Sequence, residues 1–205
     1  MKKLELGRSM VEMLGVLAII GVLSVGAIAG YQKAMMKYKL NKHTQQLSQL
    51  LNVIHRHKDS LLKIQDYEDL FSYLHKLNEI PKEMIKDETG ILYDVFQNRM
   101  VFEIRNGGVD NITWRGLYIE IKNNKAFEIC QNLINFAKGH SSYLSDFSIG
   151  SAGGKYITFY GDKYCNRTTT TADDKCANTI TNDDIYEVCQ HCEQAEECFS
   201  FIYSY

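Results

Sequence analysis

The longest apolar segment of the chain lies close to its first residue. From Met13 to Gly30 the sequence reads MLGVLAIIGVLSVGAIAG, eighteen residues without a charged side chain. A helix needs roughly 17–25 mostly apolar residues to cross the hydrocarbon core of a bilayer, so this segment has the length of a membrane span. No comparable segment follows residue 31. The pattern predicts a membrane-inserted helix followed by a polar globular domain.

The helical pattern continues beyond the apolar segment. Neither proline nor glycine occurs from Tyr31 to Ile80, and a stripe of residues recurs at alternating spacings of four and three. We therefore expect one helix from about Met10 to about Lys58, roughly 70 Å long at 1.5 Å per residue. Its first half would lie in a bilayer or a filament core, and its 47–54 face would pack against the globular domain. The stripe consists of Leu40, Thr44, Leu47, Leu51, Ile54, Lys58 and Leu61, with Thr44 and Lys58 as polar interruptions.

The rest of the chain alternates helical and extended patterns, which indicates an α+β domain. Gly107 and Gly108 separate two extended segments, as in a turn between strands. We expect several antiparallel strands packed on the second half of the long helix. Helices are predicted at 67–77 and 125–138, and strands at 101–104, 114–121, 156–160 and 199–205.

Composition narrows the classes of function. The chain of 205 residues carries 23 Lys plus Arg against 25 Asp plus Glu, a formal charge of −2, which argues against a nucleic-acid partner. Its 45% of hydrophobic residues excludes a wholly disordered chain. The single proline, Pro81, leaves a long helix uninterrupted.

The apolar segment has three interpretations. It fits a secretory signal peptide, with Lys2 and Lys3 as the basic region and Ala27-Ile28-Ala29 as a cleavage site. It also fits an uncleaved signal anchor. The third interpretation takes account of Glu12, because an ionised carboxylate inside an apolar helix costs up to about 2.5–3.5 kcal/mol at the bilayer centre and less near its edge. A signal peptide gains nothing from such a residue, so Glu12 favours a protein in which a partner recognises that position.

The residues around Glu12 resemble the N-terminus of the type IV pilin and pseudopilin family. That family carries a short charged leader ending in Gly, then an apolar helix with Glu at the fifth mature position. Here the leader would end at Gly7, and Arg8 would be the first mature residue. The family usually begins its mature chain with Phe or another apolar residue whose amine is methylated, and Arg8 departs from that pattern. The implied parts are a leader at 1–7, a long helix at 8–60 with its transmembrane or filament-core part at 13–30, and an α+β head at 61–205.

The resemblance implies a structural rather than an enzymatic function. The chain would enter a bacterial inner membrane with a periplasmic head, be cleaved after Gly7 by a prepilin peptidase, and polymerise through its N-terminal helix into an extracellular pilus-like filament. Its partners would be identical or homologous pilin subunits, the prepilin peptidase, the inner-membrane assembly machinery and membrane lipid. Such filaments serve adhesion, motility, DNA uptake or secretion. The alternative within the family is a type II secretion pseudopilin.

Glu12 and four glycines are the residues that we expect to act in assembly. Cleavage after Gly7 would create an α-amine four residues from Glu12, and Glu12 would neutralise the amine of a neighbouring subunit. Two unit charges about 4 Å apart attract by about 4 kcal/mol at an effective dielectric constant of about 20, so this pairing would set the register of neighbouring subunits. Small residues let helices approach closely in lipid. The glycines of this half are Gly15, Gly21, Gly26 and Gly30.

The charges that flank the apolar segment argue against a periplasmic head. More cations follow it than precede it, and the positive-inside rule would place the domain that follows in the cytoplasm. Long domains translocate largely regardless of such charge, and the cysteines favour export. The cations are Lys33, Lys37, Lys39 and Lys42 after the segment, against Lys2, Lys3 and Arg8 before it.

Six cysteines in a chain of this length indicate an oxidising compartment or a metal site. Six cysteines allow 15 pairings, and spacing alone does not choose among them. The resemblance is closest to the type IVb pilin pattern, which implies a Cys130–Cys198 disulfide bounding the region 130–198. We expect Cys165 to pair with Cys176. Cys189 and Cys192 then remain for the third pair. The alternative, in which one of them pairs with Cys198, stays open.

The last cysteines also support an interpretation of another class, a membrane-anchored metal or redox protein. Cys189-Gln190-His191-Cys192 is a C-x-x-C sequence, which suits zinc binding or thiol exchange. It lies in an acidic stretch, and its histidine precedes the second cysteine. We favour structural disulfides and expect no metal or cofactor. Nucleophile-elbow, zinc-protease and phosphate-loop motifs are absent from the sequence.

Two histidines and two acidic pairs are expected to be surface residues without a metal-binding role. His55 and His57 stand two residues apart on the long helix, so they point to different faces and are expected to be solvated. The acidic pairs at 173–174 and 183–184 lack the spacing of a calcium loop and are expected in solvated turns. Asn111 and Asn166 begin glycosylation sequons.

Overall fold

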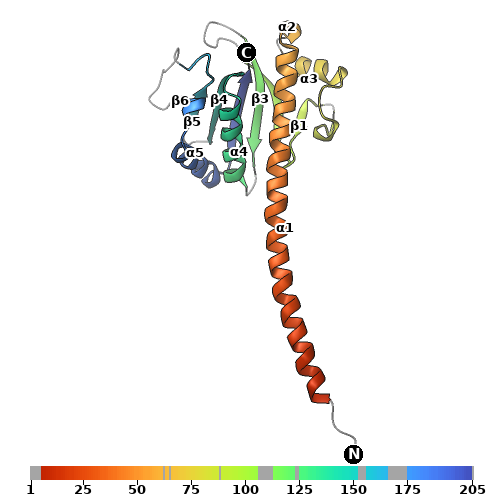
Figure 1. Cartoon of the computed structure of the whole chain (residues 1–205). Helices are drawn as coiled ribbons and strands as arrows, with labels where there is room; N and C mark the ends of the chain where they lie inside the picture. The colour runs from red at the N-terminus through yellow and green to blue at the C-terminus, as the bar shows by residue number, and fades with distance from the viewer. Residues whose placement is uncertain are drawn as a thin grey trace, which may run out of the picture. The chain divides into compact units, whose positions relative to one another are not determined.

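The structure is a computed structural model that describes residues 6–61, 63–64, 66–87, 89–105, 113–122, 125–151, 156–165 and 175–204. The chain divides into two compact units, Met1–Asn41 and Lys42–Tyr205. Helix α1 (Leu6–Arg56) is 51 residues long and contributes to both units (Figure 1). The single long helix predicted from the sequence is therefore confirmed.

The second unit is an α+β domain, as predicted. Its strands form one seven-stranded sheet in the order β1-β2-β3-β7-β4-β5-β6, with β7 in the middle, between β3 and β4. All neighbouring strands are antiparallel except β5 and β6. The elements after α1 are α2 (Lys58–Leu61), α3 (Tyr67–Lys76), η1 (Lys82–Met84), β1 (Ile91–Tyr93), β2 (Arg99–Arg105), β3 (Trp114–Ile121), α4 (Ala126–Gly139), β4 (Leu144–Ser151), β5 (Tyr156–Tyr160), β6 (Lys175–Cys176), η3 (Ala177–Thr179), α5 (Asn182–Gln194) and β7 (Cys198–Ser204).

The core lies between one face of the sheet and the helices. Leu117 and Ile119 of β3 point to this side, which we call the helix face, because alternate residues of a strand point to opposite sides. Leu47 and Leu50 of α1 are fully buried in the same cluster, together with residues of α3, α4 and α5. The predicted packing of the 47–54 face of the long helix on the globular domain is therefore confirmed. The opposite side of the sheet, on which Tyr118 lies, is called the open face.

Strands β1, β4 and β6, helix α5 and the short helices η1 and η3 were not predicted. All eight residues of β4 are buried although three of them are serines and one is glycine, so its sequence lacks the apolar alternation of an ordinary strand. Helix α5 is rich in acidic and amide residues and buries only Ile185, Val188, Cys189 and Cys192. The turn expected at Gly107 and Gly108 lies outside the described residues.

Candidate functional site

Helix α1 carries a continuous exposed apolar surface. The large apolar side chains from Met10 to Tyr31 are 53% to 75% exposed in the single chain. Contiguous apolar patches of more than a few hundred Å² mark a membrane or protein interaction surface. By length and composition, the Met10–Arg56 part of this helix is able to cross a membrane. The apolar helix therefore indicates a membrane anchor or a signal segment.

The residues expected to act in assembly lie on this helix. Glu12 is exposed among the apolar side chains, and Gly7 and Arg8 lie in the first turn. The side chain of Arg8 and residues 1–5 of the expected leader lie outside the described residues. A Cβ atom added at any of four glycines would meet nothing within 4 Å, so the single chain does not use them for its own packing; these are Gly15, Gly21, Gly26 and Gly30.

The structure joins the six cysteines in three disulfides: Cys130–Cys189, Cys165–Cys176 and Cys192–Cys198. The implied Cys130–Cys198 disulfide is therefore wrong. Helices α4 and α5 pack against each other on the helix face, and this brings Cys130 of α4 to Cys189 of α5, with their Cα atoms 5.5 Å apart. Cys192 lies almost one turn further along α5 and reaches Cys198 at the start of β7.

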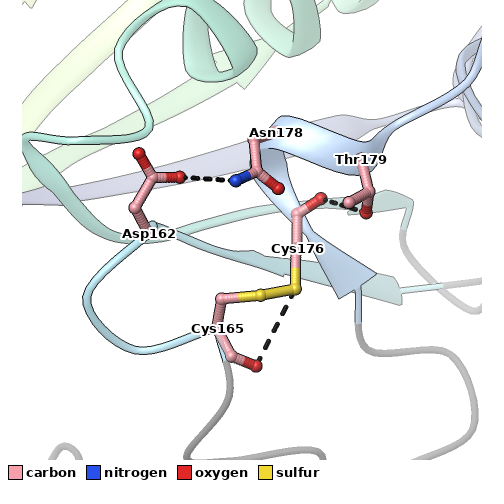
Figure 2. The surroundings of a disulfide bond; sticks show 5 residues. All are labelled: Asp162, Cys165, Cys176, Asn178 and Thr179. Atoms are coloured by element: carbon pink, nitrogen blue, oxygen red, sulfur yellow. Dashed lines mark hydrogen bonds between the residues drawn. A yellow bond between two sulfur atoms is a disulfide. The ribbon is translucent and has the colours of Figure 1, made fainter.

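The expected Cys165–Cys176 disulfide is present. It ties the turn after β5 to β6, and Figure 2 shows the polar contacts around it. The side-chain amide of Asn178 donates to Asp162 Oδ1 at 2.9 Å, and Thr179 Oγ1 donates to the carbonyl oxygen of Cys176 at 3.0 Å. This disulfide and two hydrogen bonds therefore hold a small corner at the edge of the sheet.

The C-x-x-C sequence does not form a site of its own. Cys189 and Cys192 pair with residues of two different elements, so neither thiol is available for a metal or for exchange with the other. Within the described ranges, no group of three or more His, Cys, Asp or Glu side chains is arranged to hold a metal ion. The cysteines act here as cross-links between α4, α5 and β7.

A buried polar cluster that the sequence did not indicate joins α1 to the head. His43 of α1 and Asp94, which follows β1, both have fully buried side chains, and His43 Nε2 lies 3.4 Å from Asp94 Oδ2. Asn132 of α4 completes the cluster: its Oδ1 accepts from Thr44 Oγ1 at 3.2 Å, and its Nδ2 lies 3.0 Å from His43 Nδ1. Because the amide is oriented by Thr44, Nδ2 donates to Nδ1, and neutral His43 carries its proton on Nε2. That N–H is buried 3.4 Å from Asp94 Oδ2 but does not form a hydrogen bond with it.

Burial determines the protonation of this cluster. Burial lowers the pKa of His43 to about 4, because the positively charged imidazolium would lose its contact with water there. Desolvation also raises the pKa of Asp94, although hydrogen bonds from Asn98 and the backbone N–H of Phe96 oppose that shift. His43 therefore stays neutral at physiological pH. No sequence signal marked it, because it stands beside the apolar stripe rather than in it.

His55, His57 and Asp184, which the sequence analysis considered, contact neighbouring elements of the head. His57 Nε2 lies 3.1 Å from Glu79 Oε1, and the ring of His55 contacts that of Tyr143 edge-on. Both rings are partly buried, so the expectation that they are solvated is wrong, whereas they do point to different partners. Asp184 belongs to a capping box with Thr181 at the start of α5, not to a solvated turn. Residues 173–174 and both sequon asparagines, Asn111 and Asn166, lie outside the described residues.

No protein-family model matches the chain, and no curated protein matches its sequence. The architecture itself is pilin-like: a long apolar N-terminal helix whose second half packs on an antiparallel sheet, in a head with three disulfides. The disulfides indicate an extracytoplasmic domain, because cytosolic thiols are kept reduced.

Proposed function

We propose that the chain is a structural subunit of a type IV pilus-like filament. In this proposal the prepilin is inserted in a bacterial inner membrane, a prepilin peptidase cleaves it after Gly7, and the mature chain polymerises through α1. The head lies in the periplasm before assembly and on the filament surface afterwards. The subunits of a type II secretion pseudopilus would be built in the same way.

The observation that carries the proposal is Glu12 on an exposed apolar helix of membrane-spanning length, joined to a disulfide-linked head. In lipid alone, a carboxylate at this position raises the cost of insertion. In a helical assembly, a neighbouring cation offsets that cost, and the α-amine released by cleavage after Gly7 supplies one. The four glycines that face no part of their own chain allow neighbouring helices to approach.

The test is filament formation by Glu12 variants in the native host. Glu12→Gln removes the charge with little change of shape, and we expect it to abolish filaments, as Glu12→Ala should. Glu12→Asp keeps the carboxylate and is the matched control, with filaments expected. Intact mass under non-reducing conditions checks that each variant retains three disulfides. Normal filaments from Glu12→Gln would refute the role of Glu12 in assembly.

Intact mass of the mature protein tests processing separately. A chain that begins at Arg8 and is six mass units lighter than its reduced form would support both cleavage and export. A mass 14 units above that value would indicate methylation of the Arg8 amine. A chain that begins at Gly30 would instead identify an ordinary secreted domain and overturn the proposal.

A further inference from the structure

A shallow groove lies on the open face of the sheet, away from every helix of the core. Its volume is about 410 Å³, and it crosses β2, β3 and β7. Aromatic rings form much of its surface: the rings of Tyr118 and Phe201 lie 5.0 Å apart, and Phe199 contacts Phe201 edge-on. The lining residues are Arg99, Val101, Phe102, Glu103, Tyr118 and Phe201.

Three of these residues form a straight row across the strands. Val101 of β2 is directly opposite Tyr118 of β3, and Tyr118 is directly opposite Phe201 of β7. All three therefore lie at the same height on the open face, and the row runs perpendicular to the strands. We call it the apolar row.

The charges of β2 are placed symmetrically about the apolar row. Arg99 stands two residues before Val101 and Glu103 two residues after it, so the two charges lie on the open face roughly 13 Å apart. Arg99 is loosely paired with Glu120, at 3.8 Å. For Glu103, no described cation lies within ion-pair distance, and burial raises the pKa of its carboxyl group. Arg99 therefore stands at one end of the groove, beside Glu120 and its partner Lys122, and Glu103 stands at the other end.

Side-chain size follows the same symmetry on β3. Glu120 is opposite Arg99, whereas Gly116 is opposite Glu103. A side chain at Gly116 would collide with the carbonyl oxygen of Ile202 on β7, so the strand requires glycine there. A half-turn about the apolar row exchanges Arg99 with Glu103, and exchanges the long side chain of Glu120 with Gly116, which has no side chain.

We propose that the open face binds the open face of a second copy of this chain, related by a twofold axis along the apolar row, with Arg99 of each copy on the partner's Glu103. In such an isologous contact every pair occurs twice. The partly exposed Tyr118 and Phe201 would each meet their own symmetry mate, next to the buried Val101, and Glu120 would lie over the partner's Gly116. This contact lies on the head and is independent of the assembly proposed for α1.

The size of the face indicates a weak contact. Strands lie about 4.8 Å apart and rise about 3.3 Å per residue, so β2, β3 and β7 offer at most roughly 300 Å². Trp114 and Tyr203, on the same side of the sheet, are already buried and add nothing to this area. Standard interfaces bury about 800 Å² per partner. We therefore expect reversible pairing of heads at high local concentration rather than a permanent dimer.

The test uses the full chain inserted through α1 into lipid nanodiscs that hold one copy each. Contacts between apolar helices of different copies are then excluded, and only heads can join two discs. Sedimentation velocity over a range of concentrations measures the pairing. The variants are Arg99→Glu, Glu103→Arg and the double variant R99E/E103R, with Glu193→Arg as a matched charge reversal on the exposed side of α5.

We expect each single variant to weaken pairing by at least about tenfold, because it replaces two attractive pairs with two repulsive ones. The double variant, and an equal mixture of the two single variants, should pair like the wild type, as should Glu193→Arg. Absence of wild-type pairing, single variants that pair normally, or failure of both the double variant and the mixture to restore pairing would each overturn the proposal. Unfolding transitions of each variant, matched to the wild type, show that the head is intact.

A cysteine cross-link gives a second, geometric measurement. A residue on a twofold axis meets its own copy, so a short bismaleimide should cross-link Tyr118→Cys into a dimer in the wild-type background. A spacer is needed because the backbones of two packed sheets lie about 10 Å apart, further than a disulfide spans. Glu193→Cys, on α5, is the control and should remain monomeric. Monomeric Tyr118→Cys alongside wild-type pairing of discs would overturn the proposed axis.

Discussion

At the scale of single residues, the burial of His43 makes the stability of the head sensitive to pH. His43 is neutral in the folded head because burial lowers its pKa from 6.5 to about 4. The unfolded chain binds a proton at this residue below about pH 6.5, whereas the folded chain does so only below about pH 4. Acid therefore favours the unfolded state in that interval. The raised pKa of Asp94 acts in the opposite direction, since it lets the folded head hold a proton that the unfolded chain has released.

We expect the His43 contribution to the free energy of unfolding to decrease by about 3 kcal/mol as the pH falls from about 6.5 to about 4, with no further loss below. Trp114, the single tryptophan, is buried and reports unfolding by fluorescence. Denaturant unfolding is measured across this interval for the wild type and for His43→Gln. The wild type should lose more stability on acidification than His43→Gln does, and parallel curves would contradict the prediction.

Individual residues differ in whether their contacts could be predicted from the sequence. The apolar half of α1 could be recognised from the spacing of residues along the chain, and the Cys165–Cys176 pair was expected although spacing does not choose among the pairings. His43 does not, because its burial depends on Asp94 and Asn132, which lie 51 and 89 residues away. Cys130 is similar: its partner is decided by which helix packs beside α4, and α5 was not predicted at all.

At the scale of elements, α5 depends on the hydrogen bonds at its N-terminus. Thr181 accepts from the backbone N–H of Asp184, and the Asp184 carboxylate accepts from the backbone N–H of Thr181. Although burial raises the pKa of Asp184, hydrogen bonds from Lys175 and Thr181 hold it at about 2. This short polar helix needs such a start, because its intrinsic stability in water is marginal at 13 residues.

Thr181→Ala should lower the free energy of unfolding by about 1 kcal/mol, the usual loss when an N-cap side chain is removed. Asp183→Asn is the matched control, because it alters the charge of the same turn and leaves the capping box in place. Thermal or denaturant unfolding of both variants gives the comparison. An effect of Asp183→Asn as large as that of Thr181→Ala would show that charge rather than the cap is responsible.

Elements differ in how well the sequence indicated them. Strand β3 begins and ends where it was predicted, because its apolar residues alternate and glycines precede it. Strand β4 escaped prediction because it lies between two strands and buries serine on both sides, where its neighbours rather than its own apolar pattern exclude water.

At the scale of the whole molecule, the disulfides differ in how much of the chain they restrict. Cys130–Cys189 closes 59 residues, whereas Cys192–Cys198 closes six. In the chain-entropy model, a disulfide stabilises the folded state by lowering the entropy of the unfolded chain. This stabilisation is about 4 kcal/mol for the first disulfide and about 2 kcal/mol for the second.

The double variant Cys130→Ser with Cys189→Ser should therefore lose about 2 kcal/mol more stability than Cys192→Ser with Cys198→Ser. Both pairs are buried, so the cost of placing serine in the core is similar in the two variants. Equilibrium unfolding in denaturant under non-reducing conditions measures the difference. The reverse order of stability would contradict the prediction.

The central position of β7 has a consequence for the order of folding. Strand β7 pairs with both β3 and β4, and these two strands do not pair with each other. Until residues 198–204 have emerged from the ribosome or crossed a membrane, the sheet exists at most as two separate halves, each with an unpaired edge. Unpaired edges recruit other strands, so the period before β7 arrives is the time at which this chain is most prone to aggregation and most in need of a chaperone.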